Sequence, residues 1–552
     1  MLVDDLWYKN AIIYCLDVEK YMDANGDGIG DFEGLSRRLE YLASLGVTCL
    51  WLQPFYASPN RDNGYDVSDY YSVHSKHGSL GDFVDFTHHA DSLGIRVIVD
   101  LVVNHTSVEH HWFQSARDDP DGHFHNWYVW SEERPKDHDT GMVFPGVQKT
   151  TWTYDRKASQ YYFHRFYNFQ PDLDTHNERV REEITKIMGF WLELGVSGFR
   201  MDAVPFLIER KGAGVEHTKD FEFLHEMRDF LQWRRRDAIL LAEANVLPEE
   251  SIQYFGERGD NLQMILNFPV NQRLFYAMAT GDTEPLRWAL KETQARPEAA
   301  QWVHFLRSHD ECDLGRLTED ERRQVFDAFG PDKNMQLYDR GIRRRLAPML
   351  GNDRRRLELA FSLLFCLPGT PMLQYGDEIG IGDDLSLPDR ECARTPMQWT
   401  SERHGGFSIA DKVVRPVIDD DEYGYEKVNV ADQRRDRASL LNFTGRMIRG
   451  RRECPEISWG KFEILKTNAP EVLVMRYDWR NTSLLTLHNF AEMTRKASVK
   501  VGVKGGELLV DVFDRSHSRA GPNDCHEIEL EPFGHRWFRV GAVDNAMNRA
   551  TH

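Results

Sequence analysis

Two residues of opposite charge lie two positions apart in one short apolar run of the sequence. Arg200 and Asp202 belong to Ser-Gly-Phe-Arg-Met-Asp-Ala-Val, residues 197–204. Side chains at positions i and i+2 of a β-strand share a face, so we expect the guanidinium and the carboxylate to lie together. A neighbouring cation keeps a carboxylate ionised, as a nucleophile requires. A structural ion pair would give the same pattern, and these two residues alone do not exclude it.

Further acidic residues end other apolar runs of the chain. Glu243 follows Leu-Leu-Ala, and His309 and Asp310 close another run. Acids that converge on one rim cost electrostatic free energy, which folds tolerate mainly where function needs it. One carboxylate that attacks and a second that donates a proton, about 5 Å apart, are the machinery of retaining glycoside chemistry. The sequence therefore predicts a glycoside-cleaving site built on Asp202, Glu243 and Asp310.

The elements that must position these acids form a repeating pattern. Eight β-rich runs recur, most of them followed by a helical pattern: Ala11–Leu16, Val47–Pro54, Arg96–His105, Ser197–Val204, Ala238–Asn245, Leu262–Phe268, Trp302–Asp310 and Pro371–Glu378. Val180, Ile184, Ile187 and Trp191 follow helical spacing and predict one amphipathic helix. Alternating strands and helices favour a parallel sheet covered by helices. Eight such units predict a (β/α)₈ TIM barrel with its site at the carboxyl ends of the strands.

The remaining segments predict additions to this barrel. We assign the barrel to residues 1–105 and 177–455, and an inserted lobe after the third strand to residues 106–176. Residues 311–352 form a lid-like insertion after the seventh strand. Residues 456–552 turn to alternating strands, which are typical of an antiparallel β-sandwich.

Composition narrows the class of partner. The formal net charge is −20, which argues against nucleic acid or an anionic membrane as a partner and is compatible with a neutral sugar. The seven cysteines are scattered without a CxxC pair, so neither a disulfide framework nor a zinc site is indicated. The amino-terminal residues lack the features of a signal peptide, and no apolar run is long enough to span a bilayer. We expect a soluble, cytoplasmic protein. Assembly into a homo-oligomer is left open.

Taken together, the motifs resemble the four signature regions of the α-amylase superfamily (glycoside hydrolase family thirteen), in order and in spacing. These regions are residues 100–105, residues 198–202, Glu243 and residues 309–310. The resemblance implies that Asp202 is the nucleophile, Glu243 the general acid and base, and Asp310 the acid that holds the sugar in the transition state. It further implies a set of residues that bind the substrate glucose: Asp62, Tyr65, His105, Arg200, His309 and Arg394.

Other segments resemble the trehalose synthase branch of this superfamily. They include Gln-Pro-Asp-Leu at residues 170–173 and the segment 341–348. The resemblance implies retaining α-glucosyl transfer on a small disaccharide, chiefly the isomerisation of maltose to trehalose through a covalent glucosyl–enzyme. Ser308 and the pair Asn271 and Gln272 depart from the usual family residues, which leaves the acceptor in doubt.

Two other functions are therefore kept as alternatives. One is an α-glucosidase that hydrolyses maltose-type or sucrose-type disaccharides, or a transferase that passes the glucosyl unit to another acceptor. The other is a catalytically inactive relative that serves as a binding subunit. Inactivity predicts the loss of a catalytic acid, and the presence of all three acids argues against it.

The resemblance also implies structural calcium, and no organic cofactor. Asp23, Asn25, Asp27 and Asp31 alternate oxygen ligands as a calcium loop does, with the carbonyl of Ile29 completing the set. A polar turn rich in Gly and Asp is the simpler alternative. A second calcium, at the junction of the lobe and the barrel, would take the side chains of Asn104, Asp172 and Glu209 and the carbonyls of Phe206 and Leu207.

Overall fold

A closed barrel of eight parallel strands forms the centre of the computed structural model, which describes residues 3–541. The order round the barrel is β1-β16-β12-β11-β10-β9-β5-β2, so the first and last of these strands in the chain pair with each other. The strands are β1 Ile13–Leu16, β2 Cys49–Leu52, β5 Arg96–Leu101, β9 Gly198–Met201, β10 Ile239–Ala242, β11 Met264–Leu266, β12 Gln301–Phe305 and β16 Thr370–Gln374. Each predicted β-rich run overlaps one of them, although β12 and β16 begin one residue before the predicted runs, and this agreement confirms the (β/α)₈ barrel.

The barrel strands are buried on both faces. In β2, Trp51 packs into the barrel interior while its neighbour Leu50 packs against the surrounding helices. Leu241 and Leu240 of β10 alternate in the same way, and all four side chains are fully buried. This double burial is the physical reason for the continuous apolar runs in the sequence.

Helices surround the barrel: α1 Phe32–Ser36, α2 Leu39–Leu45, α3 Leu80–Ser92, α5 Glu178–Glu193, α6 Val204–Leu207, α7 Glu222–Arg234, α8 Ser251–Phe255, α9 Phe268–Thr280, α10 Glu284–Glu292, α13 Arg354–Cys366, α14 Val430–Arg435, α15 Leu440–Glu453 and α16 Glu456–Trp459. In α5 the side chain of Asn177 accepts a hydrogen bond from the amide of Arg179 and caps the helix. The predicted apolar stripe of α5 is buried, and Trp191 packs edge-on against Phe55 and Phe83.

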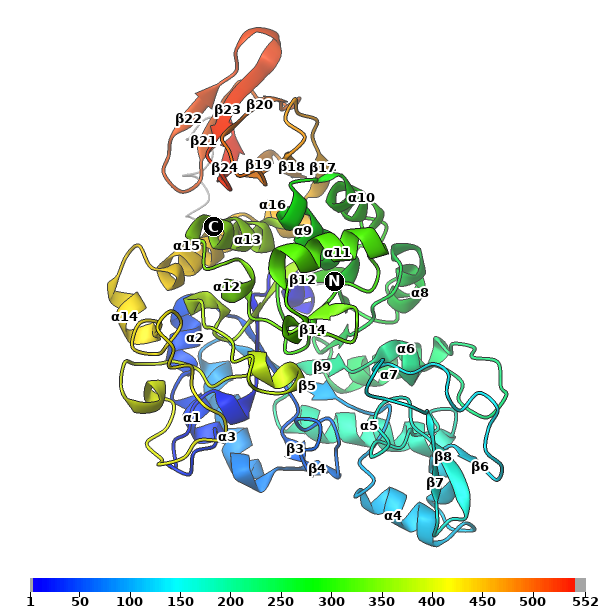
Figure 1. Cartoon of the computed structure of the whole chain (residues 1–552). Coiled ribbons are helices and arrows are strands. Elements are labelled where there is room, and N and C mark those ends of the chain that lie inside the picture. The colour runs from blue at the N-terminus through cyan, green and yellow to red at the C-terminus, as the bar shows by residue number, and fades with distance from the viewer. Residues whose placement is uncertain (1–2, 542–552) are drawn as a thin grey trace.

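Two segments leave the barrel at the carboxyl ends of its strands, where two short strands, β3 Tyr56–Ala57 and β4 Asp69–Val73, also lie. The first segment carries α4 His111–Asp118, β6 Trp130–Ser131, β7 Trp152–Asp155 and β8 Gln160–Phe163, and its three strands form an antiparallel sheet. We call it the lobe. The second carries β13 Cys312–Asp313, α11 Glu319–Phe329, β14 Gln336–Leu337, β15 Gly341–Ile342 and α12 Leu346–Met349. We call it the insertion. Figure 1 shows the lobe (cyan) at the lower right and the insertion (green, with α11 and β14) above it.

A carboxyl-terminal antiparallel domain stacks on α13 and α15, at the top of Figure 1. Its strands are β17 Lys461–Ile464, β18 Val472–Trp479, β19 Thr482–Asn489, β20 Arg495–Lys500, β21 Leu508–Asp511, β22 His517–Arg519, β23 Cys525–Leu530 and β24 His535–Val540. A turn with Phe533 at φ 56° separates β23 and β24, which follow each other in the chain, into different sheets. Trp537 donates to the Ser362 hydroxyl at 2.9 Å and ties the domain to the barrel. Within residues 3–541, no helix combines the length and the apolar character needed to cross a membrane.

Candidate active site

Strand β9 brings Arg200 and Asp202 to the rim of the barrel. The strand begins at Gly198, where an added Cβ would lie 2.3 Å from the carbonyl oxygen of Ile239 on the neighbouring strand β10. Only glycine allows this close pairing of β9 with β10. The strand ends just before Asp202, and Ala203, at φ 46°, turns the chain into α6. The predicted common face for Arg200 and Asp202 is therefore present at the strand end.

The guanidinium of Arg200 joins three carboxylates. It is 1% exposed, and its Nη1 donates to Asp202 at 2.7 Å and also to Asp100. Its Nη2 donates to Oε2 of Glu243 at 2.6 Å. Trp51 donates to the second oxygen of Asp100 at 2.8 Å, which fixes that carboxylate as a support. One planar cation thus holds the predicted nucleophile and the predicted proton donor side by side.

Asp310 lies opposite this pair and is held by a second group of cations. Arg390 lies 2.8 Å from its Oδ1, and Arg394 contacts the same oxygen at 3.3 Å. Nε2 of His309 lies 3.2 Å from Oδ2 of Asp310 and 2.8 Å from the hydroxyl of Tyr65, whose ring stacks on the imidazole. Burial lowers the pKa of His309 well below its usual value, so the imidazole is neutral at neutral pH.

The environment raises the pKa values of two of the acids and lowers that of the third. Burial raises the pKa of Glu243 to about 7, although Arg200 opposes it. Burial likewise raises the pKa of Asp202 to about 6, against the same cation. Asp310 differs, because Arg390 and its neighbouring cations outweigh burial and hold its pKa well below the usual range. Near neutral pH, Asp202 is therefore mostly ionised while a large share of Glu243 keeps its proton, as a nucleophile and a general acid require.

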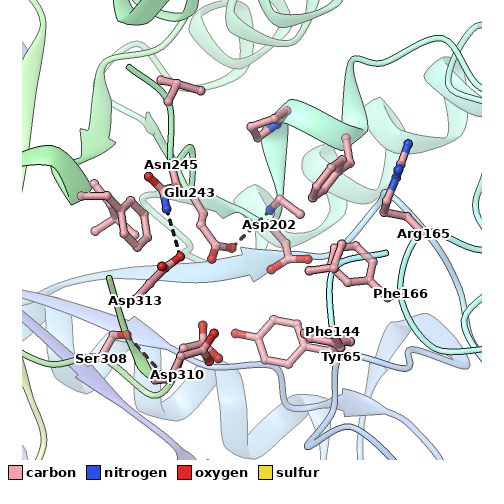
Figure 2. Close-up of a pocket in the computed structure, with 18 of the residues that line it drawn as sticks. Tyr65, Phe144, Arg165, Phe166, Asp202, Glu243, Asn245, Ser308, Asp310 and Asp313 are labelled. Carbon is pink, nitrogen blue, oxygen red and sulfur yellow. Dashed lines mark hydrogen bonds between the residues drawn. The ribbon is translucent and has the colours of Figure 1, made fainter. Parts of the chain in front are cut away.

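These acids line a pocket of about 590 Å³ at the carboxyl ends of the strands. Figure 2 shows the carboxylates of Asp202 and Glu243 pointing into one space, with Asp310 and Tyr65 across from them. The pocket has room for a disaccharide, and both its charged rim and its aromatic walls suit a sugar.

Most of the residues predicted to bind glucose also line this pocket. They are Asp62, Tyr65, His105, Arg200 and His309. Asp62 accepts a hydrogen bond from Gln170 at 2.9 Å, and Nε2 of His105 donates to the Tyr65 carbonyl at 3.1 Å. Arg394 does not line the pocket: it lies behind Asp310 and donates to the backbone of His309 at 2.8 Å. Its contact with a sugar would be indirect, through the position of that acid.

The residues that depart from the usual family pattern divide into two groups. Ser308 lines the pocket, so it can contact a sugar. Asn271 instead donates to the carbonyl of Phe305 at 2.7 Å, and Gln272 accepts from the amide of Arg316 at 2.8 Å. These two amides support the end of β12 and the insertion, and they do not face the pocket.

Sequence reasoning missed several pocket residues. Arg390 binds Asp310 directly, and its Nε donates to Glu311 at 2.8 Å. The one feature of the sequence that could have indicated this role for Arg390 is its position four residues before Arg394, which the family resemblance assigns to the sugar site. Asn245 donates to Asp313 at 3.0 Å on the far side of the pocket, as Figure 2 shows. Asn245 stands two residues after Glu243, so its place at the same strand end was predictable.

The lobe and the insertion meet at the mouth of the pocket. The ring of Phe144, from the lobe, lies 5.0 Å from that of Tyr338, from the insertion. The hydroxyls of Tyr167 and Tyr338 lie 3.4 Å apart. The guanidinium of Arg390 lies over both Phe144, at 5.4 Å, and Tyr338, at 5.5 Å. Aromatic and cation–π contacts thus join two separate segments above the acids.

The predicted calcium ligands fall in two places. Asp23, Asn25, Asp27, Ile29 and Asp31 form a loop after β1, outside the pocket. The second predicted set lies where the lobe joins the barrel, and two of its members, Phe206 and Glu209, also line the pocket. Among residues 3–541, no three His, Cys, Asp or Glu side chains are grouped so that they could hold a metal ion by themselves, so calcium at either place would also need amide, carbonyl or water oxygens as ligands.

Comparison with known proteins agrees with this geometry. Residues 16–329 and 335–460 match the family described as the catalytic domain of alpha amylase, and residues 482–539 match the carboxyl-terminal domain of the sucrose hydrolase-like type. The first match covers most of the chain, including every barrel strand except the amino-terminal part of β1.

Full-length relatives and solved structures extend the match. A trehalose synthase of Thermus thermophilus is 43% identical over 99% of this chain, which spans 57% of that protein's length. A trehalose synthase of Pimelobacter sp. (strain R48) is 40% identical over 98% of this chain and 96% of its own length. The crystal structure of an α-amylase from H. orenii superposes with a TM-score of 0.78 at 25% identity, over 96% of this chain and 99% of its own. The barrel, its three rim acids and these matches together show that the chain belongs to the α-amylase family.

Proposed function

We propose that this protein transfers α-glucosyl units between small α-glucosides with retention of configuration, and that its main reaction is the isomerisation of maltose to trehalose. The observation that carries the proposal is the pair of carboxylates on Arg200, inside a pocket lined in part by the lobe and the insertion. The trehalose synthases that resemble this chain along nearly its whole length support the choice of disaccharide.

The first half of the reaction breaks the glycosidic bond. A carboxylate oxygen of Asp202 attacks the anomeric carbon, and the bond to the departing oxygen breaks with its electron pair on that oxygen. Glu243 gives its proton to the same oxygen, so the second glucose leaves as a neutral alcohol. Asp310 stabilises the positive charge that develops on the ring in the transition state.

The second half reverses these roles. The freed glucose turns in the pocket and presents its anomeric hydroxyl. Glu243, now ionised, takes the proton of that hydroxyl, whose oxygen attacks the anomeric carbon and displaces Asp202. Two displacements restore the α configuration at the first glucose. The product is an α,α-linked disaccharide when the freed glucose reacts through its α-anomeric hydroxyl.

Whether water or sugar attacks the intermediate depends on access. The contact of Phe144 with Tyr338 narrows the mouth of the pocket and supports transfer, because a more enclosed site admits less water and retains the freed glucose longer. Hydrolysis uses the same carboxylates and is the second candidate.

Incubation with maltose alone tests this proposal. We expect the anomeric proton signal of trehalose to appear in NMR spectra while the maltose signal falls, and we expect trehalose alone to return maltose. Separate incubation with sucrose measures the preference for the departing group. Glucose as the sole product from maltose would establish hydrolysis instead and would refute isomerisation.

We further propose that the loop from Asp23 to Asp31 binds one structural calcium. Its acidic side chains accept hydrogen bonds from backbone amides of the loop, and none forms an ion pair in the described part of the chain. Burial raises the pKa of Asp31, and the negative charge of Asp23 raises it further. A cation would remove this repulsion. Asp23 also accepts from the hydroxyl of Ser408 at 2.5 Å, so the ion would fasten that distant segment as well.

Removal of this calcium is expected to lower the melting temperature more than the rate at saturating substrate. Calcium at a hundred times its Kd adds about 3 kcal/mol of stability, which a chelator removes. Differential scanning fluorimetry with and without EDTA measures the change. The Asp27→Ala variant removes one proposed ligand and leaves packing intact, since Asp27 is exposed. The melting temperature of this variant should no longer respond to the chelator. An unmodified chain that melts at the same temperature with and without chelator would contradict the proposal.

A further inference from the structure

The junction of the lobe and the barrel holds a cation that belongs to the chain itself. Nζ of Lys211 lies 2.7 Å from Oδ1 of Asn104 and 2.9 Å from Oδ2 of Asp172. It also contacts the carbonyl oxygens of Leu173, at 3.2 Å, and of Asn104, at 3.3 Å. The lysine side chain is 1% exposed and that of Asp172 is fully buried. Four oxygen atoms therefore surround one ammonium group in a closed site.

Two of the groups that surround the ammonium, the side chains of Asn104 and Asp172, were expected to bind the second calcium. The other expected ligands bind different partners. Oε2 of Glu209 accepts from Arg165 at 2.6 Å. The carbonyl of Leu207 accepts from the hydroxyl of Thr175 at 2.7 Å, and that of Phe206 accepts from the amide of Glu209. The residues present therefore do not fit a metal ion at this junction.

Charge leads to the same conclusion. The site contains two buried or half-buried acids, Asp172 and Glu209, and each already has a cationic partner, Lys211 and Arg165 respectively. A divalent ion placed between Asn104 and Asp172 would meet the ammonium at close range in a buried environment, where like charges repel strongly. Calcium would have to expel the lysine from its four oxygens, and the buried ammonium would then lose its partners.

We propose that Lys211 replaces a divalent cation at this junction, so that the lobe is fastened to the barrel without metal. The ammonium joins three segments: Asn104 beyond the end of β5, Asp172 and Leu173 on the return from the lobe, and its own segment after α6. His105, which lines the pocket, follows Asn104 directly, and its Nδ1 lies 3.3 Å from the Asn104 amide. Lys211 is thus a positioning residue for one wall of the pocket. This role does not depend on which reaction the pocket performs.

The number of calcium ions bound per chain tests whether Lys211 replaces a divalent cation. We compare the unmodified protein with its Lys211→Glu variant, which removes the ammonium and supplies a new carboxylate beside the Asn104 amide and the Asp172 carboxylate. Isothermal titration with calcium after removal of metal should give one more bound ion per chain for the variant than for the unmodified protein. Calcium should also raise the melting temperature of the variant by more. Because the comparison is a difference, an ion in the loop at Asp23 does not affect it.

Lys186→Glu is the matched control, because this substitution makes the same change of charge at an exposed position of α5. It should bind as many ions as the unmodified protein. An equal count for Lys211→Glu and the unmodified protein would overturn the proposal.

A second measurement decides the matter if Lys211→Glu does not fold. Crystals of the unmodified protein grown with excess calcium should show the Lys211 side chain between Asn104 and Asp172. Anomalous scattering from an ion at that position, with the lysine displaced, would refute the replacement.

Discussion

Replacing Asp202 with asparagine is expected to lower the turnover of maltose by roughly 10⁴-fold, because an amide cannot form the covalent glucosyl intermediate. The fold should persist. Arg200 keeps its contacts with Asp100 and Glu243, and the asparagine oxygen can accept the bond now made to Asp202. Steady-state kinetics with NMR detection of products measures the loss.

The melting temperature of the Asp202→Asn variant shows whether the lost activity comes from lost chemistry or from a damaged fold. Burial raises the folded-state pKa of Asp202 to about 6, so the folded state binds this proton more tightly than the unfolded state does. The acid therefore favours folding at low pH, and that contribution is lost as the pH rises through about 6. At pH 7 the neutral amide avoids a buried charge, and the melting temperature of Asp202→Asn should equal or exceed that of the unmodified protein.

Asp237→Asn is the matched control for this experiment. Asp237 pairs with Arg96 where β5 begins, at the end of the barrel opposite the pocket, and Arg96 holds the pKa of this carboxyl below its usual value against the effect of burial. Its replacement should cost stability but not turnover. If Asp202→Asn kept a tenth or more of the activity, Asp202 could not be the nucleophile.

Replacing Glu243 with glutamine is expected to lower the turnover of maltose by roughly 10²- to 10⁴-fold, because the departing sugar oxygen then leaves without a proton. The loss should shrink for aryl α-glucosides whose phenol leaves as a stable anion. With such substrates the first step stays fast, the second lacks its base, and the glucosyl–enzyme should accumulate. Rapid-mixing kinetics should show a burst of phenol, and mass spectrometry should detect the covalent adduct on Asp202.

The pH dependence of the same variant identifies the proton donor. For the unmodified protein, kcat/KM should rise as the nucleophile ionises near pH 6 and fall as the acid loses its proton near pH 7. The two limbs belong to the coupled pair of carboxylates. The Glu243→Gln variant, measured with an activated aryl glucoside, should keep the rising limb and lose the falling one. A falling limb that survived the substitution would assign the proton donor to another residue.

The barrel was predictable from sequence because its strands are buried on both faces. Such strands leave continuous apolar runs, and each of the eight runs overlaps one barrel strand. The strands of the carboxyl-terminal domain were harder to predict, since their residues alternate between buried and exposed. A turn such as that at Phe533 also carries the chain from one sheet to another without a break in this alternation. The rim acids were predictable for a related reason: parallel strands that close into a barrel must end at one rim.

The rest of the site depends on contacts between segments that sequence spacing does not encode. Arg390 reaches Asp310 from a segment beyond the last barrel strand, and Phe144 reaches the pocket from the lobe. Lys211 shows what a resemblance between sequences does not predict. The oxygen ligands that suggest calcium are present in the sequence, but the approach of an ammonium group to them appears only once the chain is folded.

The contact between Phe144 and Tyr338 has a kinetic consequence. The two rings belong to independent excursions of the backbone, so movements that part them widen the route between the pocket and bulk solution. In the proposed reaction, we expect such movements to shorten the residence time of the detached glucose. The partition of the glucosyl unit between a second sugar and water then depends on two surface segments as well, and selection can tune it without altering any carboxylate.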